Sequence, residues 1–333
     1  MRQLYFLLPG TSKRFACGGL WAELKTLELA RTLCPAEVVT YTQREPHTLF
    51  LPDLLKTPEA LEQVIFVLSW GFDVAKLAQR LKAFRQIYHA HSAGYGFRLP
   101  AQIPIVTVSR NSLGYWGQQA PHSLLYYLPN EISSHFYNHH QPRDIDVLVH
   151  ARKSSQYLLQ TLIPALEQQC NVFVVRGFVD DFAALLNRSK VYLYDSAEYW
   201  AMQGVSEGFG LQPLEAIACG CQVFSSVNGG LSDYLDPGFN SYKIAGFSLD
   251  YDLQRILQVV RTATPMSSQN PLLAEYRREA IVPRLETILQ DINAFFDHLA
   301  KPQAAIAPLT PWRLWQLRSQ TLVQKVQSKW FRK

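Results

Sequence analysis

The sequence predicts an α/β protein built from two Rossmann-like domains that face each other across a cleft. Short runs of β-branched and aromatic residues alternate with helical patterns, such as residues 20–33 and 158–166, which is typical of parallel sheets covered by helices on both faces. Ten such runs exceed a comfortable single open sheet, and a polar stretch with a proline at residues 138–146 separates the sixth run from the seventh. The ten runs are QLYFLL, EVVTYT, QVIFVLSW, RQIYHAH, PIVTVSR and SLLYYLPN before the break, and DVLVHAR, NVFVVRGF, KVYLYDS and QVFSSV after it.

This break divides the chain into an N-terminal Rossmann-like domain at residues 1–140, a C-terminal one at residues 141–300, and a basic tail at residues 301–333. A length of 333 residues agrees with two domains of roughly 150 residues each. The five cysteines are odd in number and show no metal-ligand pairing with histidines, so we expect reduced thiols.

Charge and hydropathy exclude some functions. No run approaches the roughly 20 apolar residues of a membrane-spanning helix, and the apolar start is too short for a secretory signal, so we expect a cytoplasmic protein. The tail holds seven basic and no acidic residues, which leaves 25 basic against 27 acidic residues in the body. The body is therefore not predicted to bind nucleic acid.

Loops that follow strands are where open α/β sheets bind ligands. After the first run, Gly18 and Gly19 sit just before an amphipathic helix, whose N-terminus attracts anions, although a pair of glycines is also an ordinary loop. The full GxGxxG fingerprint is absent, which disfavours a nicotinamide-dependent oxidoreductase.

After the seventh run, Arg152 and Lys153 suit a diphosphate. By residue type alone, however, a solvated turn is the better interpretation of this pair.

Two histidines end the fourth run. His89 and His91 alternate on a strand, so both point to one face, and glycines follow them. With no carboxylate or cysteine partner at ligand spacing, they do not predict a metal site. We expect at most a polar contact between one of them and a ligand.

The most informative loop is SEGFGLQPLEAIACG, residues 206–220. Pro213 fits the first turn of a helix, so Glu207 lies in the loop before that helix and Glu215 in its second turn. Between them, backbone amides are expected to point into the cleft. Two carboxylates that bracket free amides suit a ligand with hydroxyls at both ends and an anion in the middle, as in a sugar nucleotide. The amides belong to Gly208, Phe209, Gly210 and Leu211.

The longer stretch EGFGLQPLEAIACGCQVFSSVNGG resembles the signature of the retaining glycosyltransferases of GT-B fold, family 4 (group 1). That signature is a glutamate, seven intervening residues and a second glutamate. Further similarities run over most of residues 1–295. They are GG at 18–19, PN at 129–130, RGFV at 176–179 and Ser196.

The resemblance implies roles for individual residues. Glu207 resembles the glutamate that contacts the donor sugar near the reacting carbon, and Glu215 resembles the one that holds the ribose. His91, or else His89, resembles the first-domain histidine near the sugar. Arg152 and Lys153 resemble the basic pair on the diphosphate, and Gly19 resembles the loop glycine beside it.

The family implies transfer of a sugar from a nucleotide-diphosphate donor to a glycan, lipid-linked or cell-envelope acceptor, with retained configuration and no cofactor. The donor would bind the second domain and the acceptor the first. No DxD-type metal pair is present, and Glu207 and Glu215 are separated by part of a helix, which disfavours a retaining glycosidase. A catalytically silent sugar-nucleotide binder or partner subunit remains the alternative. The chain departs from the family pattern where Arg152 and Lys153 are adjacent and where AEYWAMQGV, residues 197–205, is inserted before the motif.

The tail PWRLWQLRSQTLVQKVQSKWFRK, residues 311–333, reads as an amphipathic helix. Two interpretations stay open: a helix that lies on an anionic membrane surface, which would make the protein peripheral on the inner face, and a helix that packs back across the first domain. Trp312, Trp315, Leu322, Val326 and Trp330 fall near one face, with Arg318, Lys325 and Lys329 largely away from it.

Overall fold

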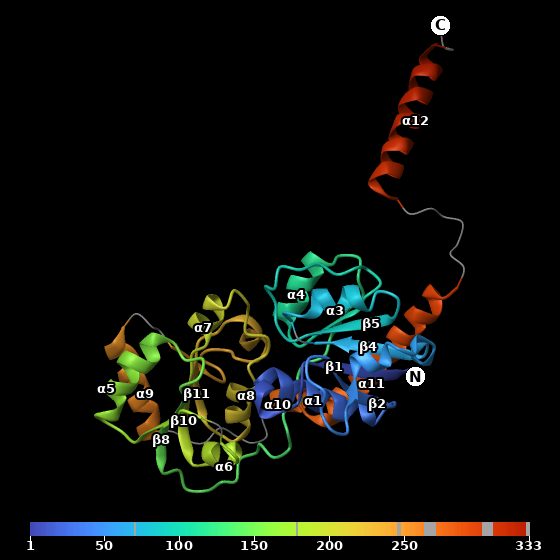
Figure 1. The fold of residues 1–333 in the computed structure, drawn as a ribbon. Coiled ribbons are helices and arrows are strands. Elements are labelled where there is room, and N and C mark those ends of the chain that lie inside the picture. Colours follow the sequence, from blue (N-terminus) through green and yellow to red (C-terminus); the bar gives the residue numbers. More distant parts are fainter. Residues whose placement is uncertain (70, 178, 245–247, 263–270, 302–308, 331–333) are drawn as a thin grey trace. The chain divides into compact units, whose positions relative to one another are not determined.

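The computed structural model describes residues 1–69, 71–177, 179–244, 248–262, 271–301 and 309–330. The chain forms two compact units, residues 1–291 and 292–333. The first unit holds two wholly parallel sheets with helices around them, which confirms the predicted α/β class (Figure 1).

The first sheet has seven strands in the order β3-β2-β1-β4-β5-β6-β7. Five of them are predicted runs of residues 1–110, and QLYFLL pairs in register with both EVVTYT and QVIFVLSW. The sixth run forms β7, and the two-residue β3 was not predicted, because two residues are too short to show a pattern. The strands are β1 (Gln3–Leu8), β2 (Ala36–Thr40), β3 (Leu49–Phe50), β4 (Val64–Leu68), β5 (Arg85–Ala90), β6 (Ile105–Thr107) and β7 (Leu125–Tyr127).

The second sheet has five strands in the order β12-β11-β10-β8-β9. The four predicted runs are present, and the short β12 extends the edge. The strands are β8 (Ile145–His150), β9 (Val172–Val175), β10 (Ser189–Tyr194), β11 (Gln222–Ser225) and β12 (Tyr242–Lys243).

Helices lie between the strands. In the first half, α1 starts at Gly18, so the two glycines begin the helix rather than precede it. The predicted helix at 158–166 begins as a π-turn and becomes α-helical only from residue 163, where Pro164 lacks the N–H of a regular turn. The helices are η1 (Lys13–Phe15), α1 (Gly18–Arg31), α2 (Leu51–Leu54), η2 (Pro58–Leu61), α3 (Val74–Arg80), α4 (Arg110–Gln119), η3 (Leu158–Leu162), α5 (Ile163–Glu167), α6 (Phe182–Asn187), α7 (Ala197–Met202), α8 (Leu211–Ala218), η4 (Gly229–Asp233), α9 (Leu249–Thr262), α10 (Pro271–Ala274), α11 (Arg278–Leu299) and α12 (Pro311–Trp330).

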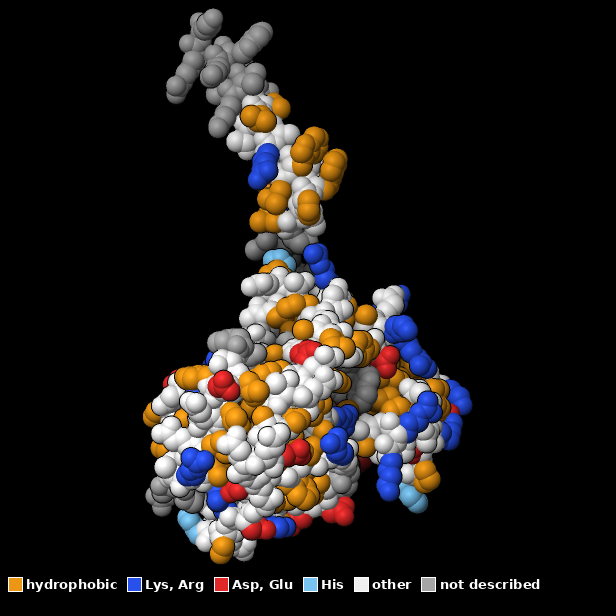
Figure 2. Space-filling view, turned by 90° about the vertical axis from the view of Figure 1, so that its left-hand side faces the viewer, with side chains coloured by type: hydrophobic (Ala, Val, Ile, Leu, Met, Phe, Trp, Pro, Cys, Tyr) orange, Lys and Arg blue, Asp and Glu red, His pale blue; other side chains and the backbone are white. Residues whose placement is uncertain are grey.

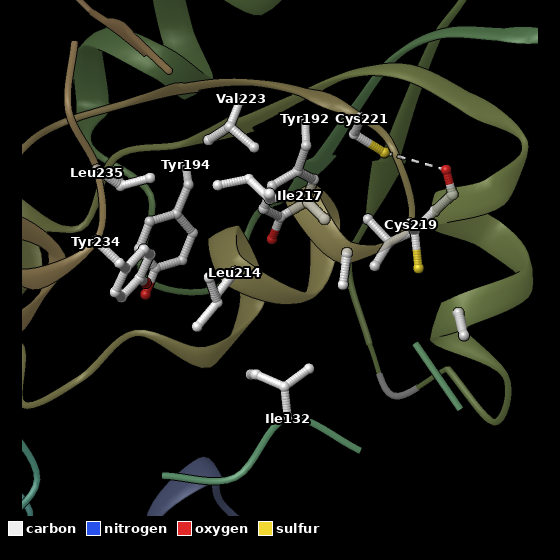
Figure 3. Packing of buried hydrophobic residues seen from close by; sticks show 14 of the residues in the cluster. Ile132, Tyr192, Tyr194, Leu214, Ile217, Cys219, Cys221, Val223, Tyr234 and Leu235 are labelled. Atoms are coloured by element: carbon white, nitrogen blue, oxygen red, sulfur yellow. Dashed lines mark hydrogen bonds between the residues drawn. The ribbon is translucent and has the colours of Figure 1, made fainter. Parts of the chain in front are cut away.

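Both faces of the second sheet are buried. Val147 and Val149 point into a core with α5 and α9, whereas Leu148 points into the opposite core with α6 and α8. This alternation explains why the strands are apolar throughout. Figure 3 shows the second of these cores, in which Leu214 and Ile217 of α8 face the tyrosines of β10.

The start of α11 lies against the first sheet. The Arg284 guanidinium stacks over the Tyr127 ring of β7 at 5.3 Å, and Arg277 donates to the carbonyls of Ile132, Ser133 and Phe136. The compact units divide at residue 291, inside α11. The predicted domain limits at residues 140 and 300 stay predictions.

The second unit contains α12, in which the rings of Trp312 and Trp315 stack at 5.0 Å. No helix among the described residues is both long and apolar enough to span a bilayer. The side chains of residues 325–330, and residues 331–333 altogether, lie outside the described part, as does Phe178 of the RGFV stretch.

Candidate active site

The motif loop before α8 depends on its glycines. Gly208 lies so close to the first half of the unit that an added Cβ would stand 1.5 Å from the backbone carbonyl oxygen of His91. Gly210 caps α8 in the left-handed region with φ of 76°. A Cβ on Gly229, whose φ is 54°, would stand 2.4 Å from the carbonyl oxygen of Glu207. At Gly208 no space exists for a side chain, and at Gly210 and Gly229 side chains also rarely adopt the left-handed backbone.

Hydrogen bonds join this loop to the end of β5. The Ser206 N–H donates to the Ala93 carbonyl at 2.9 Å, and the Ser92 hydroxyl donates to the Ser206 carbonyl at 2.5 Å. The Ala93 N–H donates to the Ser206 hydroxyl at 3.2 Å. The structure therefore brings His91 and Glu207, which the sequence placed 116 positions apart, to one contact between the two sheets.

Glu207 is buried, with 4% of its surface exposed, and the two hydrogen bonds that described side chains donate to its carboxylate both reach the same oxygen. The Tyr194 hydroxyl and the Trp200 Nε1–H each donate to Oε2 at 2.6 Å. Sequence reasoning missed both donors. The feature of the sequence that pointed toward Trp200 was the stretch inserted before the motif. The first part of this stretch forms α7.

The two residues of the predicted basic pair, Arg152 and Lys153, have different surroundings in the structure. Lys153 adopts φ of 69° and is half-buried, and its ammonium lies 4.3 Å from the centre of the Trp200 ring. Burial lowers the pKa of Lys153, and the nearby Glu207 carboxylate counteracts this effect. Arg152 is exposed, so only Lys153 joins the Glu207 group.

The two histidines share a carboxylate, contrary to the expectation that they have no such partner. Glu23, from the second turn of α1, places Oε2 2.6 Å from Nδ1 of His89 and 2.7 Å from Nε2 of His91. No local pattern indicates this contact, because the residues are 66 and 68 positions apart. Burial raises the pKa of Glu23, but the two histidines outweigh it and bring the value to about 2.

The ionised Glu23 selects the histidine tautomers. An acceptor between two ring nitrogens requires a proton on each of them. Burial lowers the pKa of His91, which favours the neutral ring. His91 then carries its proton on Nε2 and keeps a lone pair on Nδ1, which can accept a hydrogen bond.

The same three residues offer ligand atoms within 4.8 Å of one another, as a metal site would require. Their nitrogen–oxygen distances of 2.6 and 2.7 Å are hydrogen-bond distances, however. Two ligands of one zinc ion would stand about 3 Å or more apart at metal–ligand distances of about 2.0–2.2 Å. The arrangement is that of a hydrogen-bonded triad.

Glu215 lies in the second turn of α8, as predicted. Burial raises the pKa of its carboxyl to about 7, with Lys25 of α1 acting in the opposite direction. The carboxyl of Glu215 therefore changes from protonated to ionised near neutral pH.

The two glycines at the start of α1 leave room at the helix N-terminus. No described atom lies within 4 Å of a Cβ built on Gly18, and only the Cys17 sulfur approaches one on Gly19, at 3.8 Å. Packing therefore does not require glycine at either position. Their predicted role beside a diphosphate stays a prediction.

Known proteins resemble this chain in sequence and in fold. A sequence model of the family described as "Glycosyl transferases group 1" matches residues 142–258. No curated protein matches the chain.

Solved structures with similar folds cover most of the chain. Sucrose-phosphate synthase from Thermosynechococcus elongatus has a TM-score of 0.61 at 14% identity, over 88% of this chain and 100% of that one. HepE of Anabaena, in complex with UDP and glucose, has a TM-score of 0.62 at 15% identity, over 87% and 100%. A glycosyltransferase from Rickettsia africae has a TM-score of 0.63 at 12% identity, over 88% and 98%. At these identities, the likeness concerns the fold.

Proposed function

We propose that this chain is a group 1 glycosyltransferase of GT-B fold, and that it moves a sugar from a nucleoside diphosphate to a glycan or lipid-linked acceptor with retained anomeric configuration. The observation that carries the proposal is the environment of Glu207. A buried carboxylate, to which described residues donate at one oxygen, lies beside a half-buried ammonium, and the next residue, Gly208, approaches the backbone of His91. Among the described residues, none donates to the second oxygen, which we propose accepts from a ligand.

Each part of the group has a use in the reaction. When the bond to the leaving group breaks, negative charge develops on the diphosphate, and Lys153 with the amides at the start of α1 can stabilise it. Positive charge develops on the sugar, where Glu207 supplies the opposite charge. The reaction proposed here uses no metal ion and no further cofactor.

Glu215 is proposed to accept hydrogen bonds from the ribose hydroxyls. Only the ionised carboxylate accepts two such bonds, and its pKa is about 7. Donor binding should therefore strengthen as the pH rises from 6 to 8. At the higher pH the Glu215 carboxyl is already ionised, so it need not release a proton before the donor binds.

Calorimetric titration with UDP, GDP and ADP tests the donor site. One diphosphate should bind at micromolar strength, and Glu215→Ala should weaken it by about 1–3 kcal/mol through the loss of a partner for buried hydroxyls. Lys56→Ala, which removes an exposed ion pair with Asp53 of α2, is the control and should leave the affinity unchanged. If no diphosphate binds the folded wild-type chain, the proposed function is wrong.

Turnover distinguishes the enzyme from a silent binder. With donor and candidate acceptors present, an enzyme releases free nucleoside diphosphate, whereas a binding protein does not.

We also propose that the tail binds an anionic membrane surface. Residues 301–333 contain seven basic and no acidic residues, and α12 carries several apolar residues together with Arg313 and Arg318. Figure 2 shows hydrophobic side chains gathered along this helix with basic ones between them. Each basic residue near such a surface contributes about 1 kcal/mol. The apolar residues of this helix include Trp312, Leu314, Trp315, Leu322 and Val323.

Deleting residues 301–333 should abolish sedimentation with vesicles that contain phosphatidylserine. The intact chain should bind these vesicles at low salt, bind less at high salt, and ignore neutral vesicles. Trp312→Ser/Trp315→Ser should reproduce most of the loss without a change in charge. Vesicle binding that survives the deletion would contradict the proposal.

A further inference from the structure

The hydrogen bonds of Glu207 are one-sided. Both described donors, Tyr194 and Trp200, reach Oε2, and no described residue donates to Oε1. Burial and the adjacent Glu207 charge raise the pKa of Tyr194 well above its ordinary value, so its phenol keeps the proton that it donates. Indole is a donor only. Both partners therefore donate to Oε2, and the carboxylate cannot turn away from them without losing two bonds.

Trp200 is itself fixed by the loop that follows β8. The Ser155 N–H donates to the Asp195 carbonyl just before α7, and the Gln156 N–H donates to the Glu198 carboxylate on α7 at 2.7 Å. Beyond α7, the Val205 N–H donates back to the carbonyl of Trp200 at 3.2 Å. The helix that carries the indole is thus anchored on both sides.

The other side of the indole meets a cation. Lys153 belongs to the same β8 loop and places its ammonium over the Trp200 ring, while the ring edge donates to Glu207. The Trp200 side chain therefore contacts both the Lys153 ammonium and the Glu207 carboxylate. A cation over an indole face is attracted by the ring electrons, and tryptophan is the strongest partner of this kind.

We infer that Trp200 is a positioning residue: its N–H, with the Tyr194 hydroxyl, orients Glu207 so that Oε1 faces the donor sugar, and its ring sets Lys153 beside the leaving diphosphate. This inference rests on the proposed function for the identity of the ligand. The contact between the indole and Glu207 does not depend on it.

Two substitutions separate the two roles. Trp200→Phe keeps an aromatic ring under Lys153 and removes the N–H, so kcat should fall about ten- to a hundredfold, as expected for losing a hydrogen bond to a charged group, while the KM for the donor changes less than about twofold. Trp200→Leu also removes the ring and should in addition weaken nucleoside diphosphate binding. Tyr194→Phe should resemble Trp200→Phe. Tyr199→Phe, which alters the neighbouring ring on α7 at 5.1 Å, is the matched control and should retain wild-type kcat.

A spectroscopic measurement tests the contact without activity. The chain has seven tryptophans, and ¹⁵N-labelled protein should lose one indole N–H signal in Trp200→Phe. That same signal should move upfield in Glu207→Gln, because the acceptor loses its charge, and should stay in place in Glu215→Gln.

An indole signal that ignores Glu207→Gln, or a Trp200→Phe variant with wild-type kcat, would overturn the inference. Equal diphosphate affinities of Trp200→Phe and Trp200→Leu would overturn the part that concerns Lys153. If wild-type protein binds no nucleoside diphosphate, the proposed function fails, whereas the indole signal still tests the contact. If Trp200→Phe does not fold, Tyr194→Phe and the signal in the wild-type background decide.

Discussion

Glu207→Gln is expected to lower the rate of sugar transfer by about a hundred- to a thousandfold, the range seen when one electrostatic stabiliser of a transition state is removed. Glutamine has nearly the same shape as glutamate, and its amide oxygen can still accept from Tyr194 and Trp200. The change therefore removes charge rather than packing. Release of nucleoside diphosphate under saturating donor measures kcat directly.

Glu215→Gln is the control for this prediction. It lies eight positions further along the same motif and should raise the KM for the donor more than it lowers kcat, because its proposed partner is the ribose and not the reacting carbon. Circular dichroism and thermal unfolding should show both variants folded. A Glu207→Gln enzyme with wild-type kcat would contradict the proposed role of this carboxylate.

Glu23→Gln is expected to reduce the free energy of unfolding at pH 7 by about 3 kcal/mol. Glu23 is 1% exposed and serves two buried histidine N–H groups, and an amide cannot satisfy both with the same strength. Removing one partner from a buried charged group typically costs about 3–5 kcal/mol. Urea unfolding of both proteins measures the difference, and Glu28→Gln, on the exposed side of the same helix, is the control.

The pH dependence of this effect has a defined sign. The pKa of Glu23 is about 2 in the folded protein against an ordinary value of 4.5, so the unfolded chain binds the proton more tightly. The stabilisation is present above pH 4.5 and is lost as the pH falls from about 4.5 to about 2, by about 3 kcal/mol in total. Wild type and Glu23→Gln should converge in this range. A difference that stays constant from pH 7 to pH 3 would contradict the assignment.

Much of the fold follows from local pattern. The ten predicted runs all form strands, because apolar runs of four to eight residues between turn residues are the mark of a sheet that is buried on both faces. The two-residue β3 and β12 carry no such pattern, and only pairing with a neighbour defines them. The motif helix was also predictable, since Pro213 and the glycines around it are local signals.

The chemical site was predictable in part. Glu207, Glu215, Lys153 and His91 could be named as candidates because residue type and place after a strand or at a helix start are visible in a sequence. Their partners were not: the carboxylate between the histidines comes from α1, and the donors to Glu207 come from β10 and the inserted α7. Nothing in the local pattern around Glu23 distinguishes it from a surface residue of an amphipathic helix.

The sequence by itself therefore determined the fold class, the two sheets and the motif that places two carboxylates around the start of α8, because these depend on hydrophobic period and backbone preference over a few residues. Only the tertiary structure decided which side chains meet those carboxylates and the histidines. A hydrogen bond or ion pair across 66 positions of chain depends on how sheet and helix pack, and packing joins residues whose sequence neighbourhoods carry no record of each other.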